Sequence, residues 1–335
     1  MPLITPAIIS LTLALGPSQA PAQTPAQAMP AMPAAPAPDA GASYVPERVF
    51  LSDKKRFTDF EAMLADLQTA DVVFVGEQHD DPNTHRLELA LMEGLARRRG
   101  SIILSLEMFE RDAQTALDGY LAGRIPEEEF LKPSRPWPRY KTDYRGLVEL
   151  AKARGWTVVA SNVPRSLASG VSKTGFDFLK TLPDDQKAWV AADLRCPFDD
   201  YYGNFADTMK EMTAHPMPGN EKQTDAERKQ MVDRFYYAQC VKDETMAESI
   251  AAAYRKSAAS RPIVVHFNGS FHSDYGLGTA SRVERRLKGV RVKLVTMVPV
   301  ENLDRLNPTK DDRKRADYLV YTYRPKPSPP AKPGS

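Results

Sequence analysis

The sequence predicts an α/β fold: a central, mainly parallel sheet with crossover helices and an all-helical insertion between its third and fourth strands. The first reason is that short β-branched apolar runs alternate with helical segments along the chain. The second is that residues 166–260 contain several helical patterns and no convincing strand. The third is that polar residues follow the ends of four of the apolar runs, as expected where ligands bind in open α/β sheets.

Each predicted element rests on its own stretch of sequence. The six predicted strands are 71–77, 101–107, 156–162, 262–269, 291–298 and 317–323. Crossover helices are predicted near 83–99, 144–154 and 280–288, and another helix near 56–69 precedes the first strand. Within the insertion, helices are predicted near 184–194, 204–213 and 225–256, with a polar loop over 215–225.

Both ends of the chain differ in composition from the part expected to fold. Residues 1–20 contain an apolar run and a small-x-small cleavage pattern, which predict a signal peptide and a periplasmic protein. A Pro/Ala-rich linker over 21–43 and a tail over 324–335 are predicted to be disordered, which leaves one domain over 44–323. Position 21 is not a lipid-attachment cysteine, and no apolar run is long enough for a transmembrane segment.

Charge and cysteine content narrow the choice of partners. The chain has 45 basic and 43 acidic residues, so nothing in its charge favours a nucleic-acid partner. Cys196 and Cys240 are the only cysteines, and in an oxidising compartment such a pair is a candidate disulfide. Two separately buried thiols are the alternative, because the sequence gives no distance between them.

Polar residues at the predicted strand ends form the candidate site. Because the carboxyl ends of parallel strands meet at one edge of the sheet, we expect these side chains to converge there. Imidazole and carboxylate groups can bind Mn, Zn or Fe, act as acid and base, or hold a cofactor. Individually, each could instead be a helix cap or a structural ion pair. The residues are Glu77, His79, Glu107, Asn162, Arg165, His266, Asn268 and His272.

Longer segments around these residues resemble a known family. GEQHDDPNTHRLELALMEGL (76–95), LSLEMFERD (104–112) and VVHFNGSFHSDYGLG (264–278) resemble the ChaN-type haem-binding lipoprotein family of the Tiki superfamily, as do the segments 137–165 and 239–250. The superfamily's two Gly-x-x-His motifs match Gly76 to His79 and Gly269 to His272, and its acidic residue matches Glu107.

The resemblance implies two alternative functions for one pocket. The ChaN branch implies haem binding and iron acquisition at the bacterial envelope, with a cleft that a homodimer partner could complete. Other branches imply a metal-dependent hydrolase, peptidase-like or esterase-like. The candidate haem-binding residues are Tyr140, Tyr144, Asn162, Arg165, Asn268 and His272; the candidate catalytic and metal-binding residues are Glu77, His79, Glu107 and His272.

Overall fold

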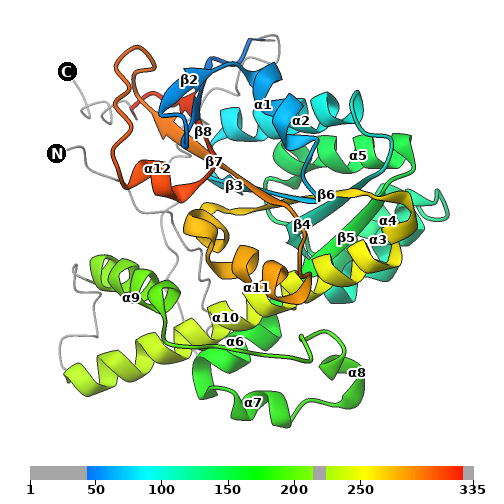
Figure 1. The fold of residues 1–335 in the computed structure, drawn as a ribbon. Coiled ribbons are helices and arrows are strands. Elements are labelled where there is room, and N and C mark those ends of the chain that lie inside the picture. The colour runs from blue at the N-terminus through cyan, green and yellow to red at the C-terminus, as the bar shows by residue number, and fades with distance from the viewer. Residues whose placement is uncertain (1–43, 214–223, 327–335) are drawn as a thin grey trace, which may run out of the picture.

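A single mixed sheet runs through the centre of the protein (Figure 1). The computed structural model describes residues 44–213 and 224–326, and within them the sheet has eight strands in the order β2-β1-β8-β7-β3-β6-β4-β5. The six strands from β8 to β5 are parallel, which confirms the predicted fold class. Their bounds are β3 (Val72–Glu77), β4 (Ile102–Glu110), β5 (Thr157–Asn162), β6 (Ile263–Gly269), β7 (Val292–Val300) and β8 (Tyr318–Tyr323).

An N-terminal hairpin extends this sheet and is absent from the sequence prediction. Strand β1 (Glu47–Leu51) pairs antiparallel with β8, and β2 (Arg56–Thr58) pairs antiparallel with β1. The helix predicted over 56–69 is therefore wrong at its start. Helix α1 covers Phe60–Leu67. Asp59 caps its start by accepting a hydrogen bond from the backbone N–H of Ala62 at 2.7 Å. A three-residue edge strand is too short to show a periodicity of its own.

The insertion between β5 and β6 contains helices and no strand in its described part, as predicted. The helix predicted over 184–194 is wrong beyond its first turn. The backbone N–H groups of Ala191 and Ala192 donate to the side chains of Thr245 and Glu248 instead of continuing a helix. The helices are α6 (Arg165–Thr174), α7 (Asp177–Lys180), α8 (Asp184–Lys187), α9 (Asp200–Thr213) and α10 (Asp225–Lys256).

Helix α10 has the predicted bounds, and a disulfide joins it to the segment before α9. Thr224 caps the helix through a reciprocal pair of hydrogen bonds with Glu227. Cys196 is bonded to Cys240, with the two Cα atoms 5.7 Å apart. The bond fixes the segment before α9 against α10, within the insertion. The predicted signal peptide and linker, most of the predicted tail and most of the polar loop lie outside the described residues.

Helices cover both faces of the sheet, which explains why its strands are continuous apolar runs. Every residue of β3 is buried. On one face α2 (Pro82–Ala96) and α5 (Arg145–Arg154) pack with α1 around Leu91. On the other face α11 (Gly278–Arg286) packs beside α10, and Val283 joins the apolar cluster there. In the part of the chain that the structure describes, no helix is long and apolar enough to cross a membrane.

Four short elements between β4 and α5 are also absent from the sequence prediction. They are a 3-10 helix, η1 (Arg111–Ala113), helices α3 (Gln114–Leu121) and α4 (Glu127–Ser134), and a five-residue π-helix, η2 (Tyr140–Tyr144). Single π-helical turns are uncommon and frequently occur at functional sites. This one directs the Tyr144 hydroxyl toward the end of β3.

The strand order brings the candidate residues together. Strand β6 follows β5 in the chain, but it lies between β3 and β4 in the sheet. Glu77 is therefore opposite Gly269, and Leu106 is opposite Phe267. The ends of β3, β4 and β6 become neighbours at the carboxyl edge of the sheet, where the polar residues are found.

Candidate functional site at the carboxyl edge of the sheet

The two Gly-x-x-His segments touch each other, and both glycines lie at the contact. A Cβ atom on Gly76 would lie 2.9 Å from the Cα of Ser270, in the other segment. A Cβ atom on Gly269 would lie 2.9 Å from Nε2 of His79. Because non-bonded carbons pack no closer than about 3.5 Å, a side chain at Gly76 would push the segments apart, whereas one at Gly269 would displace the His79 ring. The two motifs thus form one structural unit.

Glu77 and His79 form a hydrogen-bonded ion pair at the end of β3. Nδ1 of His79 lies 2.6 Å from Oε1 of Glu77, and the Tyr144 hydroxyl donates to the same oxygen. Burial alone would raise the pKa of Glu77, but His79 holds it below its usual value. Burial likewise disfavours a charge on His79, yet Glu77 raises the pKa of this imidazole. The Glu77 side chain is 1% exposed and that of His79 is 29% exposed, so the imidazole links the buried carboxylate to solvent.

Glu107 and His272 form the second pair, across from the first. Oε2 of Glu107 accepts a hydrogen bond from the backbone N–H of Gly269 at 2.7 Å, and Oε1 lies 3.3 Å from Nε2 of His272. Burial opposes ionisation of Glu107, but the His272 charge holds its pKa well below the usual value. Burial also disfavours charged His272, whereas Glu107 and Asp243 raise its pKa to about 10. His272 is therefore cationic at neutral pH.

Asp243 on α10 completes this pair, although sequence reasoning did not identify it. Its Oδ1 lies 2.7 Å from Nδ1 of His272 and also accepts a hydrogen bond from Thr279 at 2.8 Å. Its Oδ2 accepts from the Tyr201 hydroxyl at 2.8 Å. In the sequence Asp243 is one of many charged residues along a long helix, and nothing in its spacing distinguishes it. Only the packing of α10 against the end of β6 reveals its role.

The two acid–histidine pairs, Glu77–His79 and Glu107–His272, are called the rim below. Lys242, the residue before Asp243, adds a positive charge beside the rim. Its side chain is half-buried. Burial lowers the pKa of Lys242, while the carboxylates of Glu107 and Asp243 oppose that change. Arg165, which was predicted from the sequence, is exposed at the start of α6 and close enough to repel this ammonium group. Two cations therefore stand at the side of the rim nearest the insertion.

Behind Glu77 lies another group of charged side chains, on α2 and η2. Nδ1 of His85 lies 2.9 Å from Oε2 of Glu88, and its Nε2 lies 3.4 Å from Oδ2 of Asp143. Burial lowers the pKa of His85, but Glu88 and the other carboxylates raise it to about 10. Among the described residues, only Glu77, His85 and Glu88 bring three potential metal ligand atoms within 4.8 Å of one another.

The other predicted residues occupy buried positions around the rim. Tyr140 and Tyr144 are each 2% exposed, and Tyr140 packs against Phe109 and Phe130. Asn162 donates to the backbone carbonyl of Glu107 at 3.1 Å. Asn268 donates to Ser273 Oγ at 3.0 Å.

His266 does not reach the rim, contrary to the sequence expectation. It pairs with Phe74 in the middle of the sheet, and its Nδ1 lies 2.9 Å from Ser105 Oγ. Burial lowers its pKa to about 4, so this imidazole is neutral at pH 7. The position three residues before the end of the strand explains the error, since the side chain points into a covered face.

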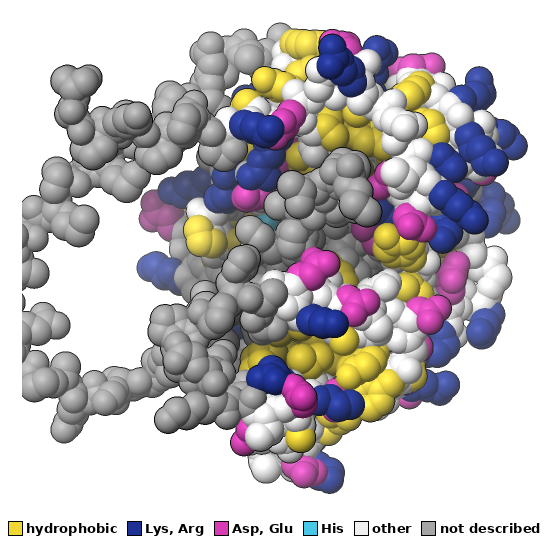
Figure 2. Space-filling model, turned by 90° about the vertical axis from the view of Figure 1, so that its left-hand side faces the viewer, with side chains coloured by type: hydrophobic (Ala, Val, Ile, Leu, Met, Phe, Trp, Pro, Cys, Tyr) yellow, Lys and Arg dark blue, Asp and Glu magenta, His cyan; other side chains and the backbone are white. Residues whose placement is uncertain are grey.

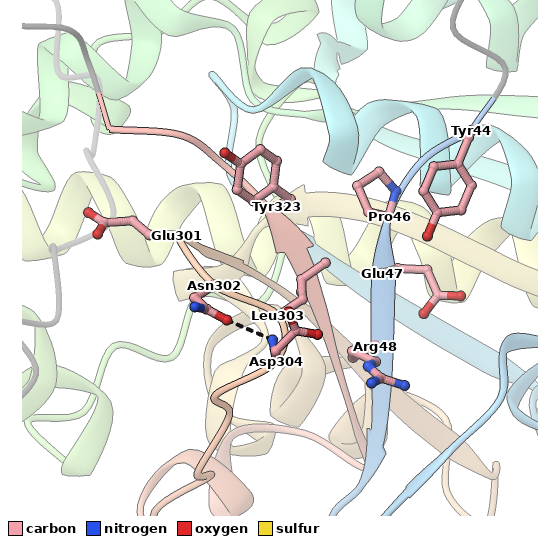
Figure 3. Close-up of a pocket in the computed structure, with 9 residues that line it drawn as sticks. All are labelled: Tyr44, Pro46, Glu47, Arg48, Glu301, Asn302, Leu303, Asp304 and Tyr323. Atoms are coloured by element: carbon pink, nitrogen blue, oxygen red, sulfur yellow. Dashed lines mark hydrogen bonds between the residues drawn. The ribbon is translucent and has the colours of Figure 1, made fainter.

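A pocket of about 470 Å³ lies further along the same edge (Figure 3). It is formed by the ends of β7 and β8 and by the start of β1, and Tyr44 and Tyr323 belong to its lining. None of the predicted site residues lines it. Arg324, which follows β8, pairs with Asp80 through both guanidinium NH groups, and this links the pocket to the residue after His79.

The fold and the rim define an α/β protein with a buried acid–histidine site at the carboxyl edge of its sheet. Residues 63–283 match the family of haem-binding uptake proteins of the ChaN type, in the Tiki superfamily. This match spans more than half of the chain, so the protein belongs to that family, as the sequence predicted. No curated protein matches the sequence.

Two solved structures were found to be similar to this chain to different degrees. ChaN of Campylobacter jejuni, described as binding haem cofacially, has a TM-score of 0.60 and 17% sequence identity. The match covers 82% of this chain and 96% of that one. A protein from Bacillus cereus has a TM-score of 0.41 and 10% identity, with coverage of 78% of this chain and 90% of that one. Only the comparison with ChaN carries weight, and at this identity it supports the fold alone.

Proposed function

We propose that this protein binds haem and takes part in haem or iron acquisition at the bacterial envelope. Membership of a haem-binding family supports the first part. The observation that carries the proposal further is a partly exposed cluster of aromatic side chains on the helical insertion, next to the rim. A porphyrin needs flat apolar walls, a ligand for iron, and cations for its propionates.

The aromatic wall is formed by the segment before α9 and by α10. Phe198 is 54% exposed, and its ring lies 4.4 Å from that of Tyr202. Phe235 and Tyr237 are half-buried beside them. Figure 2 shows apolar side chains gathered low on the face where Figure 1 places α9 and the start of α10. A contiguous cluster of partly exposed aromatic side chains is typical of a surface that a ligand or partner covers, so this surface suits a porphyrin face.

The aromatic wall continues inward to the second Gly-x-x-His motif. Phe271, the residue before His272, packs against Tyr201 at 5.1 Å and against Phe205 at 6.1 Å between ring centroids. Lys242 lies on the same helix as the wall and faces the rim with Arg165. A porphyrin on the wall would thus have apolar contacts on one side and two cations within the same region for its carboxylates.

The proposed cellular setting rests on separate features. The Cys196–Cys240 bond is stable in an oxidising compartment and supports export. The predicted signal peptide agrees with a periplasmic location. We further propose that two copies assemble around haem, because an exposed aromatic wall on each copy would then be covered from both sides.

A haemin titration of the full chain tests the proposal. We expect a saturable Soret change, with Phe198→Ser weakening the affinity by about tenfold or more because the porphyrin loses an aromatic wall. Tyr323→Phe, at another partly exposed tyrosine, is the matched control and should leave the affinity unchanged. Absence of saturation by the wild-type chain would overturn the proposal.

The same titration identifies the iron ligand. Tyr202→Phe is expected to move the Soret band, since Tyr202 is half-buried at the wall and its hydroxyl, which donates to Asp233 at 2.7 Å, would turn to the iron. Tyr140→Phe and Tyr144→Phe test the tyrosines predicted from the sequence. Their hydroxyls are buried, so ligation by either would require η2 to open. A band shift confined to these two variants would place the iron at η2 instead of the wall.

A further inference from the structure

The buried group behind the rim has a geometry of its own. Glu77 ends β3, whereas His85 and Glu88 lie one turn apart on α2 and therefore share a helix face. The three side chains bring a nitrogen and two carboxylate oxygens within 4.8 Å of one another. Glu77, His85 and Glu88 are 2%, 3% and 0% exposed, so water does not compete freely for them.

Two oxygens in this group are unsatisfied. Oε2 of Glu77 and Oε1 of Glu88 are buried and have no hydrogen-bond partner among the described residues. Buried polar atoms are nearly always paired, because an unpaired group loses its hydration without compensation. Two such atoms on two carboxylates of the same group require a positive charge between them, either a proton on Glu88 or a cation that takes its place.

The remaining contacts are those that surround metal ligands in proteins. Nε2 of His85 lies 3.1 Å from the backbone carbonyl of His79, which can fix the proton there and leave Nδ1 free to coordinate. Oε1 of Glu77 is held by His79 and by the hydroxyl of Tyr144. These outer contacts orient the imidazole and one carboxylate before any ion arrives.

We propose that Glu77, His85 and Glu88 bind one divalent transition-metal ion, of the Mn²⁺, Fe²⁺ or Zn²⁺ class. Two carboxylates and one imidazole suit these ions and balance a charge of two, once binding has displaced the protons that the side chains carry in the empty site. The set differs from Glu77, His79, Glu107 and His272, which the sequence suggested for a metal. In this arrangement the two ring nitrogens of His272 remain paired with the carboxylates of Glu107 and Asp243, so neither binds the ion. The ion lies on the α2 side of the rim.

Metal binding by the full chain, stripped with a chelator, tests the site. Mn²⁺ is titrated and the free ion is followed by electron paramagnetic resonance, with Zn²⁺ as a competitor. We expect one Mn²⁺ per chain, and Glu88→Gln should weaken binding by about 10- to 100-fold because it removes a ligand charge. Glu107→Gln removes another buried carboxylate of the rim and should bind like the wild type.

The outcomes separate this site from its alternatives. No Mn²⁺ or Zn²⁺ binding by the folded wild type would overturn the proposal, as would loss of binding in Glu107→Gln but not in Glu88→Gln. Circular dichroism checks folding, and His85→Asn replaces Glu88→Gln if that variant is unfolded. Haemin titration of the same variants shows independently whether haem binding survives, so failure of the metal site is distinguishable from failure of the proposed function.

Discussion

Asp243→Asn tests whether the second ion pair makes His272 cationic at neutral pH. The structure places Oδ1 of Asp243 at 2.7 Å from Nδ1 of His272, and Glu107 at 3.3 Å from Nε2. At an effective dielectric constant of about 20, these attractions are about 6 and 5 kcal/mol. Burial offsets much of this, since the pKa of His272 is raised from 6.5 to about 10, equivalent to about 5 kcal/mol.

The amide of Asn keeps the shape of the side chain and removes its charge. We therefore expect the pKa of His272 to fall by about three units, because Glu107 alone must then offset burial. The measurement is a histidine titration by nuclear magnetic resonance, with the His272 signal assigned by its absence in His272→Gln. Thr279→Val is the matched control, since it removes an uncharged partner of the same Asp243 oxygen and should move the pKa by less than about one unit.

Two results would refute this reasoning. One is a His272 pKa that stays above about 9 in Asp243→Asn, which would mean that Glu107 and the backbone hold the charge alone. The other is an equal shift in Thr279→Val, which would mean that packing of α10, not the carboxylate, controls the imidazole. Far-ultraviolet circular dichroism confirms that each variant keeps the wild-type fold.

Two further predictions concern stability. Replacing both Cys196 and Cys240 by Ser should lower the free energy of unfolding by about 4 kcal/mol, because the bond closes a loop with a sequence separation of 44. Urea denaturation measures this loss, and a loss below about 1 kcal/mol would contradict the prediction. Burial lowers the pKa of neutral His266 from 6.5 to about 4. Its contribution to the free energy of unfolding is therefore complete above pH 6.5 and falls by about 3 kcal/mol as the pH drops toward 4. Stability measured at pH 7 and pH 4.5 should therefore fall less in His266→Gln than in the wild type, and equal falls would exclude His266 as the cause.

The sheet was predictable because its central strands are buried on both faces. Strands such as β3, with every residue buried, need apolar β-branched residues throughout, and that pattern is visible without any partner. The hairpin β1–β2 was not predictable in the same way. Its strand β2 has three residues, none of them buried, and it exists because β1 offers a free edge.

The candidate site likewise contains residues that the sequence predicts and residues that only the folded structure reveals. Glu77, His79, Glu107 and His272 could be found because each follows a recognisable strand, and parallel strands end at one edge. Asp243 and Lys242 could not, because they lie within a helix whose sequence separation from the rim is large. Their effect on His272 and Glu107 depends on where α10 crosses the sheet.

By itself, the sequence determined the α/β class, the six parallel strands, the helical insertion and the family, because local periodicity and short motifs carry that information. Tertiary structure alone decided the charges of the rim and the wall beside it. It placed β6 between β3 and β4, laid α10 against the end of β6, and buried Glu88 next to Glu77. The physical reason is that electrostatic interactions depend on distance and burial, which residues far apart in the chain acquire only on folding.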